Sequence, residues 1–249
     1  MSLLDSRFRA SVVLAGFIVG ILACTSGQRS LAATPPAALP QTATVAADVP
    51  NLYEDQRQVD EYIRSGRYDK DVAKVIVAAR AWLEKRAKTA VKPAIVLDID
   101  ETSLSNWPAY RVNGWGRVVN GGCDLPQGPC GLRAFQALGQ SKAIPATLAL
   151  ARRARELGVA VFFISARPAN LRQATERNLR KQGYEWTGLI LLPDGAHFVS
   201  AVDFKAPERR KIKERGYTIV LSLGDQESDL KGGYAERTFK LPNPVYYLP

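Results

Sequence analysis

Pro93-Ala-Ile-Val-Leu-Asp-Ile-Asp-Glu-Thr-Ser-Leu-Ser-Asn106 is the stretch from which both the fold and the reactive centre can be predicted. Its continuous apolar run, 94–97, is typical of a strand that is buried on both faces of a parallel sheet. Ligands of open α/β sheets bind at the carboxyl ends of such strands. Because side chains alternate along a strand, Asp98 and Asp100 should start on the same face. The stretch therefore predicts two neighbouring carboxylates in a binding crevice.

Helix and strand patterns alternate along the rest of the chain. Further apolar strands are expected over 159–164, 189–192 and 218–223, and helices over 144–157, 169–182 and 208–215. A helical segment, 52–89, interrupted at Ser65-Gly66, precedes the first strand. This alternation predicts an α/β fold of three layers, in which helices cover both faces of a parallel sheet.

A segment of little periodicity, residues 103–143, follows the first strand and is called the insertion below. Segments of this length inside a compact domain are usually functional, so we interpret it as a loop or a small cap. Its aromatic residues include Trp107, Tyr110 and Trp115. Their rings either stack on a flat leaving group of a substrate or pack the insertion onto the core.

The amino terminus has the pattern of an export signal. Arg7 and Arg9 precede an apolar stretch, 10–23, that is shorter than a membrane-spanning helix requires. Residues 1–23 are therefore interpreted as a secretory signal peptide. Residues 24–51 are rich in alanine, proline and threonine and are typical of a tether, which leaves 52–249 for the folded domain.

Ile21-Leu-Ala-Cys24 resembles a bacterial lipobox, which implies a lipid on Cys24 and an anchor in the membrane of the bacterial cell envelope. Ordinary cleavage after Ala32, giving a periplasmic or secreted protein, is the alternative. In either case the protein would meet oxidising conditions, so Cys123 and Cys130 are expected to form a disulfide, with two free thiols as the alternative. The formal net charge of +10 is scattered over expected helix faces with no nucleic-acid motif, so no nucleic-acid partner is expected.

Four motifs in chain order resemble those of the haloacid dehalogenase (HAD) superfamily. The residues Asp98, Asp100 and Thr102 match its DxDxT nucleophile motif, and the longer form up to Asn106 resembles its acid phosphatase branch, the class B/C acid phosphatases and plant vegetative storage proteins. The second, third and fourth motifs correspond to Ser165, to Lys205 and to Gly224-Asp-Gln-Glu-Ser-Asp229. The tail, 237–247, also resembles that branch. The resemblance implies a Rossmann-like HAD fold.

The resemblance further implies a Mg²⁺-dependent acid phosphatase that works through an aspartyl-phosphate. Asp98 would attack phosphorus, and Asp100 would protonate the leaving group and then activate water. Ser165 and Lys205 would hold the phosphoryl oxygens, with Arg209 and Arg210 as rivals for the role of Lys205.

Metal ligands and substrate contacts follow from the same resemblance. Asp225, the Asp98 carboxylate and the Asp100 carbonyl would bind Mg²⁺, and Asp229 would be a ligand or would orient one. Thr102 and Arg167, within the first two motifs, would contact a small phosphorylated substrate together with the three aromatic rings, which favours nucleoside monophosphates or aryl phosphates. A phosphotransferase of the same fold, or a storage or binding relative without turnover, is the alternative, although intact Asp98 and Asp100 argue against the latter.

Overall fold

The computed structural model of the chain describes residues 49–196 and 198–248. The expected signal peptide, the lipobox cysteine Cys24 and most of the expected tether lie outside these residues. Within the described part, every helix is too short or too polar to cross a bilayer.

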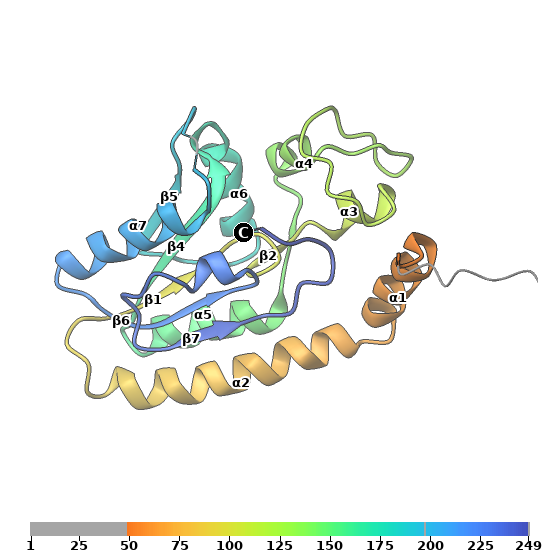
Figure 1. Cartoon of the computed structure of the whole chain (residues 1–249). Helices are drawn as coiled ribbons and strands as arrows, with labels where there is room; N and C mark the ends of the chain where they lie inside the picture. Colours follow the sequence, from red (N-terminus) through yellow and green to blue (C-terminus); the bar gives the residue numbers. More distant parts are fainter. Residues whose placement is uncertain (1–48, 197, 249) are drawn as a thin grey trace, which may run out of the picture. The chain divides into compact units, whose positions relative to one another are not determined.

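A five-stranded parallel sheet forms the centre of the described part, in the order β5-β4-β1-β6-β7 (Figure 1). Its strands are β1 (Pro93–Leu97), β4 (Ala160–Pro168), β5 (Gly188–Leu192), β6 (Thr218–Gly224) and β7 (Thr238–Lys240). The predicted parallel α/β sheet is confirmed, and its four predicted strands are present. The edge strand β7 was not predicted, because it is three residues long and its side chains are mostly exposed, so it has no apolar run.

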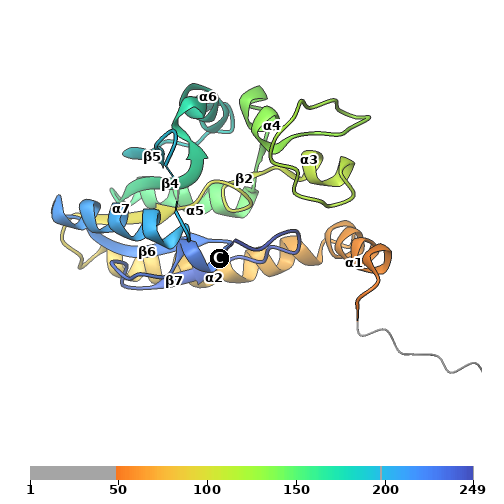
Figure 2. The same cartoon turned by 45° about the horizontal axis from the view of Figure 1, so that its top comes forward.

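Helices cover the two faces of this sheet, as Figures 1 and 2 show. The helices of the described part are α1 (Leu52–Arg64), α2 (Arg67–Ala87), α3 (Trp107–Val112), α4 (Leu132–Leu138), α5 (Pro145–Glu156), α6 (Arg172–Lys181) and α7 (Val202–Glu214). The helices α2 and α5 pack against one face, where Ile95 and Leu97 of β1 point. The helix α7 packs against the other face, where Ala94 and Val96 point. The alternation of β1 thus places Asp98, two residues after Val96, on the side of α7.

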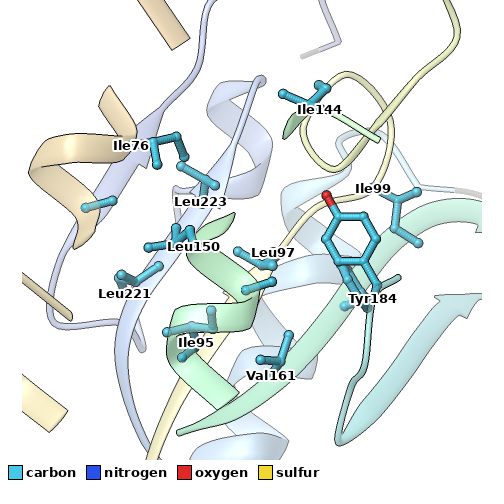
Figure 3. Packing of buried hydrophobic residues seen from close by; sticks show 14 of the residues in the cluster. Ile76, Ile95, Leu97, Ile99, Ile144, Leu150, Val161, Tyr184, Leu221 and Leu223 are labelled. Atoms are coloured by element: carbon cyan, nitrogen blue, oxygen red, sulfur yellow. The ribbon is translucent and has the colours of Figure 1, made fainter. Parts of the chain in front are cut away.

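The larger hydrophobic cluster lies between the sheet and the α2/α5 layer (Figure 3). Leu97, Val161 and Leu221 come from three adjacent strands and are fully buried in it. They pack together with Ile76 of α2 and Leu150 of α5. Burying each such side chain contributes roughly 1.5–3 kcal/mol, so this cluster fixes the central strands and, with them, the residues at their carboxyl ends.

The prediction of a helix beginning at Glu208 was wrong, because α7 begins six residues earlier, at Val202. Proline lacks the N–H that a helix interior uses, so the sequence favours a start after Pro207. The structure instead accommodates Pro207 inside the helix. Lys205 is consequently held within the first two turns of α7, and its side chain is buried.

The insertion is more ordered than its sequence suggests. It contains α3 and α4, and its two ends meet in an antiparallel ladder of β2 (Leu104–Ser105) and β3 (Lys142–Ala143). The expected disulfide between Cys123 and Cys130 is present, with an S–S distance of 2.03 Å. Cys130 packs with Ala109 and Phe135 in a small separate core. The insertion is therefore a compact cap with its own apolar centre.

Candidate active site

One cavity of about 100 Å³ lies at the carboxyl edge of the sheet. All six residues that were expected to act in catalysis or metal binding line it: Asp98, Asp100, Ser165, Lys205, Asp225 and Asp229. They are called the floor below. They meet because β1 lies between β4 and β6, so that three strands and the loops after them end at one edge.

Lys205 joins two carboxylates of the floor. Its Nζ donates a hydrogen bond to Asp98 Oδ1 at 2.6 Å and another to Asp229 Oδ1. Burial would lower the pKa of Lys205, but Asp229 and Asp98 outweigh it and raise that pKa, so the ammonium stays charged. Burial raises the pKa of Asp98 well above its ordinary value, although Lys205 opposes the shift.

Neither rival of Lys205 reaches the reacting groups. Arg209 donates to the backbone oxygens of Asp229, Lys231 and Gly233, so it fixes the loop after β6 rather than a ligand. Arg210 is exposed and pairs with Glu214, at 3.4 Å. Of these three cations, Lys205 is the one whose side chain contacts the carboxylates of the floor.

Three buried carboxylates form a group that fits a divalent cation. Oxygens of Asp98, Asp225 and Asp229 lie within 4.8 Å of one another. When all three are ionised, they and the Lys205 ammonium carry a formal charge of −2, which a divalent cation would balance. Hard oxygen donors of this kind suit Mg²⁺. The chemistry and the charge of the donor set are therefore consistent with the expected metal site.

Asp225 is held in place by three neighbours, of which two come from outside its own motif. Thr102 Oγ1 donates to its Oδ1 at 3.0 Å, and Gln226 Nε2 and Asn243 Nδ2 donate to its Oδ2 at 2.6 and 2.7 Å. Burial and the neighbouring Asp229 raise the pKa of Asp225 to about 6. A cation near Asp225 would relieve this repulsion, since opposite charge favours the ionised form.

Gly224 allows the acidic residues of the fourth motif to fold together. A Cβ added at Gly224 would collide with the side chain of Asp229. The backbone N–H of Gln226 also donates to Asp229 Oδ2, at 2.9 Å. The glycine of the GDxxxD motif therefore provides the space that Asp229 needs to reach Lys205.

Asp100 has a different environment from Asp98. The Arg167 guanidinium holds it through two nitrogens, with Nη2 at 2.8 Å and Nε at 3.1 Å from its oxygens. Asn106 Nδ2 and Gln136 Nε2 donate to its Oδ1 at 2.6 and 3.0 Å. Burial would raise the pKa of Asp100, but Arg167 outweighs it and holds that pKa below its ordinary value. Asp100 is therefore kept ionised in this arrangement.

Ser165 lies near the carboxyl end of β4 and lines the cavity. Its Oγ accepts a hydrogen bond from the backbone N–H of Arg167, at 3.2 Å. Its own hydrogen has no acceptor among the described residues, so the hydroxyl can donate to an oxygen in the cavity. This is the arrangement expected of a phosphate-binding hydroxyl.

Four of the five expected substrate contacts lie elsewhere. Thr102 is fully buried and holds Asp225. Tyr110 and Trp115 are buried in a cluster with Leu132, and Trp107 packs on Tyr68 and Trp115. The structure places these side chains outside the cavity lining, and favours the alternative that the rings pack the insertion onto the core. Arg167 does line the cavity, but its guanidinium donates to Asp100 and to Thr175 Oγ1.

Several residues at the cavity were not predicted. Gln136 comes from α4 of the insertion, and Asn243 and Tyr246 come from the tail after β7. Of the described residues that line the cavity, Tyr246 is the one aromatic side chain. The resemblance of the tail to the acid phosphatase branch was a signal for its importance, but nothing in its pattern indicated which atoms it would contact.

A buried carboxylate after a central parallel strand, linked through lysine to a second acidic group, defines a phosphoryl-transfer site of the HAD type. The family model described as HAD superfamily, subfamily IIIB (acid phosphatase), matches residues 29–249. The chain belongs to this family, and the resemblance read from its four motifs is confirmed. It is accordingly a phosphomonoesterase, a hydrolase.

Relatives in plants agree with this assignment, and a bacterial structure shares the fold. The chain is 36% identical over 192 residues to the stem 28 kDa glycoprotein of Glycine max, covering 76% of this chain and 72% of that protein. It is 34% identical to acid phosphatase 1 of Solanum lycopersicum, covering 61% of this chain and 58% of that protein. The class C acid phosphatase from Bacillus anthracis has the same fold, with a TM-score of 0.61 at 24% identity over 79% of this chain and 86% of that one.

Proposed function

We propose that this protein is a Mg²⁺-dependent acid phosphatase that hydrolyses small phosphomonoesters through an aspartyl-phosphate at Asp98. One observation carries the proposal: Asp98 directly follows the central strand, lines the cavity and is paired with Lys205, and two further carboxylates lie beside it. A nucleophilic carboxylate and a phosphoryl group are both anionic and repel each other. Cations beside both groups reduce this repulsion, so that the carboxylate can approach phosphorus.

The residues of the floor divide the reaction between them. The Asp98 carboxylate forms a bond to phosphorus as the bond to the leaving oxygen breaks. The Ser165 hydroxyl and the Lys205 ammonium hold phosphoryl oxygens while charge moves onto the leaving group. Asp225, with Asp98 and the Asp100 carbonyl, would hold Mg²⁺, and Asp229 would be a ligand or would orient one. The metal, when bound, offsets the charge of the phosphoryl oxygens.

Asp100 is proposed as the group that exchanges protons with the leaving oxygen and then with water. The pair with Arg167 keeps its pKa low, which suits the second step, in which Asp100 accepts a proton from the attacking water. For the first step Asp100 must carry a proton. A phosphoryl dianion beside Asp100 would raise its pKa, because a like charge disfavours the ionised form.

Two alternatives of the same fold predict different products. A phosphotransferase passes the phosphoryl group to an alcohol, and a storage relative releases nothing. The test is a panel of nucleoside, aryl, sugar and glycerol phosphates, incubated with and without Mg²⁺ and with glycerol as a competing acceptor. Free phosphate that appears only with the metal supports the proposal. Phosphoglycerol as the main product, or no release from any ester, would contradict it.

Export is proposed as well. The disulfide in the insertion supports folding in an oxidising compartment. We propose the bacterial cell envelope, with a lipid on Cys24 rather than cleavage near Ala32. Intact mass of the exported protein decides between them, since a mature chain beginning at Ala33 would exclude the lipid anchor.

A further inference from the structure

Two arginines of the insertion lie together at the mouth of the cavity. Arg117 and Arg133 both line it, although sixteen positions separate them in the chain. Two backbone hydrogen bonds bring them together, from Leu132 N to Val118 O at 2.8 Å and from Arg133 N to Val119 O at 3.1 Å. The guanidinium of Arg117 also lies 5.3 Å from the ring centroid of Tyr246. Arg117, Arg133 and Tyr246 are called the rim below.

The rim arginines differ from the other cations of the cavity. Lys205 and Arg167 are buried, and each is paired with a carboxylate of the floor. Arg117 and Arg133 are exposed, and across the described residues neither has a carboxylate within ion-pair distance. Among the described residues, no carboxylate therefore balances the charge of these two arginines.

The rim lies on the side of the cavity where the leaving group must project. Arg133 and Gln136 are three positions apart on α4, so their side chains share a face of that helix. Gln136 Nε2 donates to Asp100 Oδ1, at 3.0 Å. Asp100 is the residue proposed to protonate the leaving oxygen. Asp100 and the rim line the same cavity, so a leaving group that takes its proton from Asp100 lies beside the rim.

We propose that Arg117 and Arg133 form a subsite for a second anionic group, so that the preferred substrates are phosphomonoesters whose leaving group carries a carboxylate or a further phosphate. Guanidinium groups suit both anions, because their paired N–H donors match two oxygens. The inference rests on the proposed phosphatase activity and names the substrate class of the same cavity.

The test compares esters that differ only in a second anion. The full enzyme with Mg²⁺ is assayed on meta- and para-carboxyphenyl phosphate against phenyl phosphate, and on phosphoglycerate against glycerol phosphate. The wild type should prefer the carboxylated members at least about fivefold in kcat/KM, the effect of one partly exposed ion pair. Arg117→Ala and Arg133→Ala should each remove most of this preference, Arg133→Lys should keep most of it, and Arg133→Glu should invert it.

Arg111→Ala is the matched control. Arg111 is an exposed arginine of the same insertion that lies on a separate groove beside Trp107 and Leu125. Replacing Arg111 should leave the preference for the carboxylated esters intact. Raising the salt concentration should weaken this preference in the wild type, because salt screens exposed charges. Equal kcat/KM values within both wild-type pairs, or a preference that survives both alanine replacements, would overturn the subsite alone. No hydrolysis of any of these esters would overturn the phosphatase proposal together with it.

Discussion

The floor and the rim of the cavity carry charge in opposite ways. On the floor, Asp98 is buried and pairs with Lys205, and Asp100 is half-buried and pairs with the buried Arg167. Arg117 and Arg133 on the rim are exposed, without a carboxylate partner in the described structure. A buried unpaired charge costs several kcal/mol, so floor charges must be balanced in place. An exposed unpaired charge costs little free energy, so it can remain unpaired until a ligand binds. The contrast assigns reaction chemistry to the floor and substrate selection to the rim.

The largest effect should follow from removing a metal-binding carboxylate of the floor. Asp225→Ala should weaken Mg²⁺ binding more than about 100-fold. Loss of a residue that only hydrogen-bonds a metal ligand costs up to about 100-fold, and loss of the ligand itself should cost more. Activity should then depend on high Mg²⁺, and EDTA should silence the wild type. Titration calorimetry and Mg²⁺-dependent kinetics measure this. Full activity of the dialysed enzyme in EDTA would show that the reaction does not require the metal.

A smaller effect is expected from the tail residue that holds Asp225. Asn243→Ala removes the 2.7 Å hydrogen bond to Asp225 Oδ2 and should weaken Mg²⁺ binding by about 10–100-fold. Because Asn243 acts through Asp225, saturating Mg²⁺ should restore most of kcat. The control is Asn120→Ala, an exposed asparagine of the insertion. Unchanged metal affinity in Asn243→Ala would show that the tail does not position the ligand.

The pH dependence of metal binding comes next. The pKa of Asp225 is about 6 in the folded protein, above its ordinary 3.8. Protons should therefore compete with Mg²⁺ below about pH 6, at up to tenfold in affinity per pH unit. The stability contributed by this raised pKa is complete below 3.8 and is lost as the pH rises through 6, so the metal-free melting temperature should fall across that window.

The control for this pH effect is Asp225→Asn, whose side chain cannot titrate. In this variant the melting temperature of the metal-free protein should fall less as the pH rises. Saturating Mg²⁺ should likewise offset the loss of stability near neutral pH. Calorimetric scans with EDTA and with Mg²⁺ measure both. Equal Mg²⁺ affinity at about pH 5 and about pH 7 would contradict the raised pKa of Asp225.

The smallest effect on catalysis should come from the rings of the insertion. Trp107→Ala and Trp115→Ala should lower the melting temperature, because each removes buried aromatic packing worth about 3–5 kcal/mol at a fully buried site. KM for aryl phosphates should change less than about twofold, since neither ring lines the cavity. A raised KM at unchanged melting temperature would restore the stacking role that the sequence suggested.

The sequence was most informative where the chain is regular. Asp98, Ser165 and Asp225 were predictable because each follows an apolar strand, and parallel strands bring their carboxyl ends to one edge. Lys205 was identified from its motif, although the start of its helix was predicted at the wrong residue. The motif order, more than any single motif, made the family evident.

The sequence was least informative where segments without periodicity meet. Gln136 and Asn243 reach Asp100 and Asp225 from the insertion and the tail, and hydrogen bonds between such distant segments leave no pattern in the chain. The sequence could not decide between the two roles of Trp107 and Tyr110, because an aromatic residue near a motif is equally suited to a core and to a binding site. Arg117 and Arg133 lie together because backbone hydrogen bonds join their two segments of the insertion, and no pattern in the sequence indicates these bonds.

The central claim is that Asp98 becomes phosphorylated, and trapping the intermediate tests it most directly. Asp100→Asn should slow hydrolysis of the acyl phosphate, so a single turnover of this variant with Mg²⁺ is quenched in acid and reduced with borohydride. Peptide mass spectrometry should then find homoserine at position 98, and none in a variant that also carries Asp98→Asn. Unmodified Asp98 with phosphate released, or reduction at another carboxylate, would contradict the account.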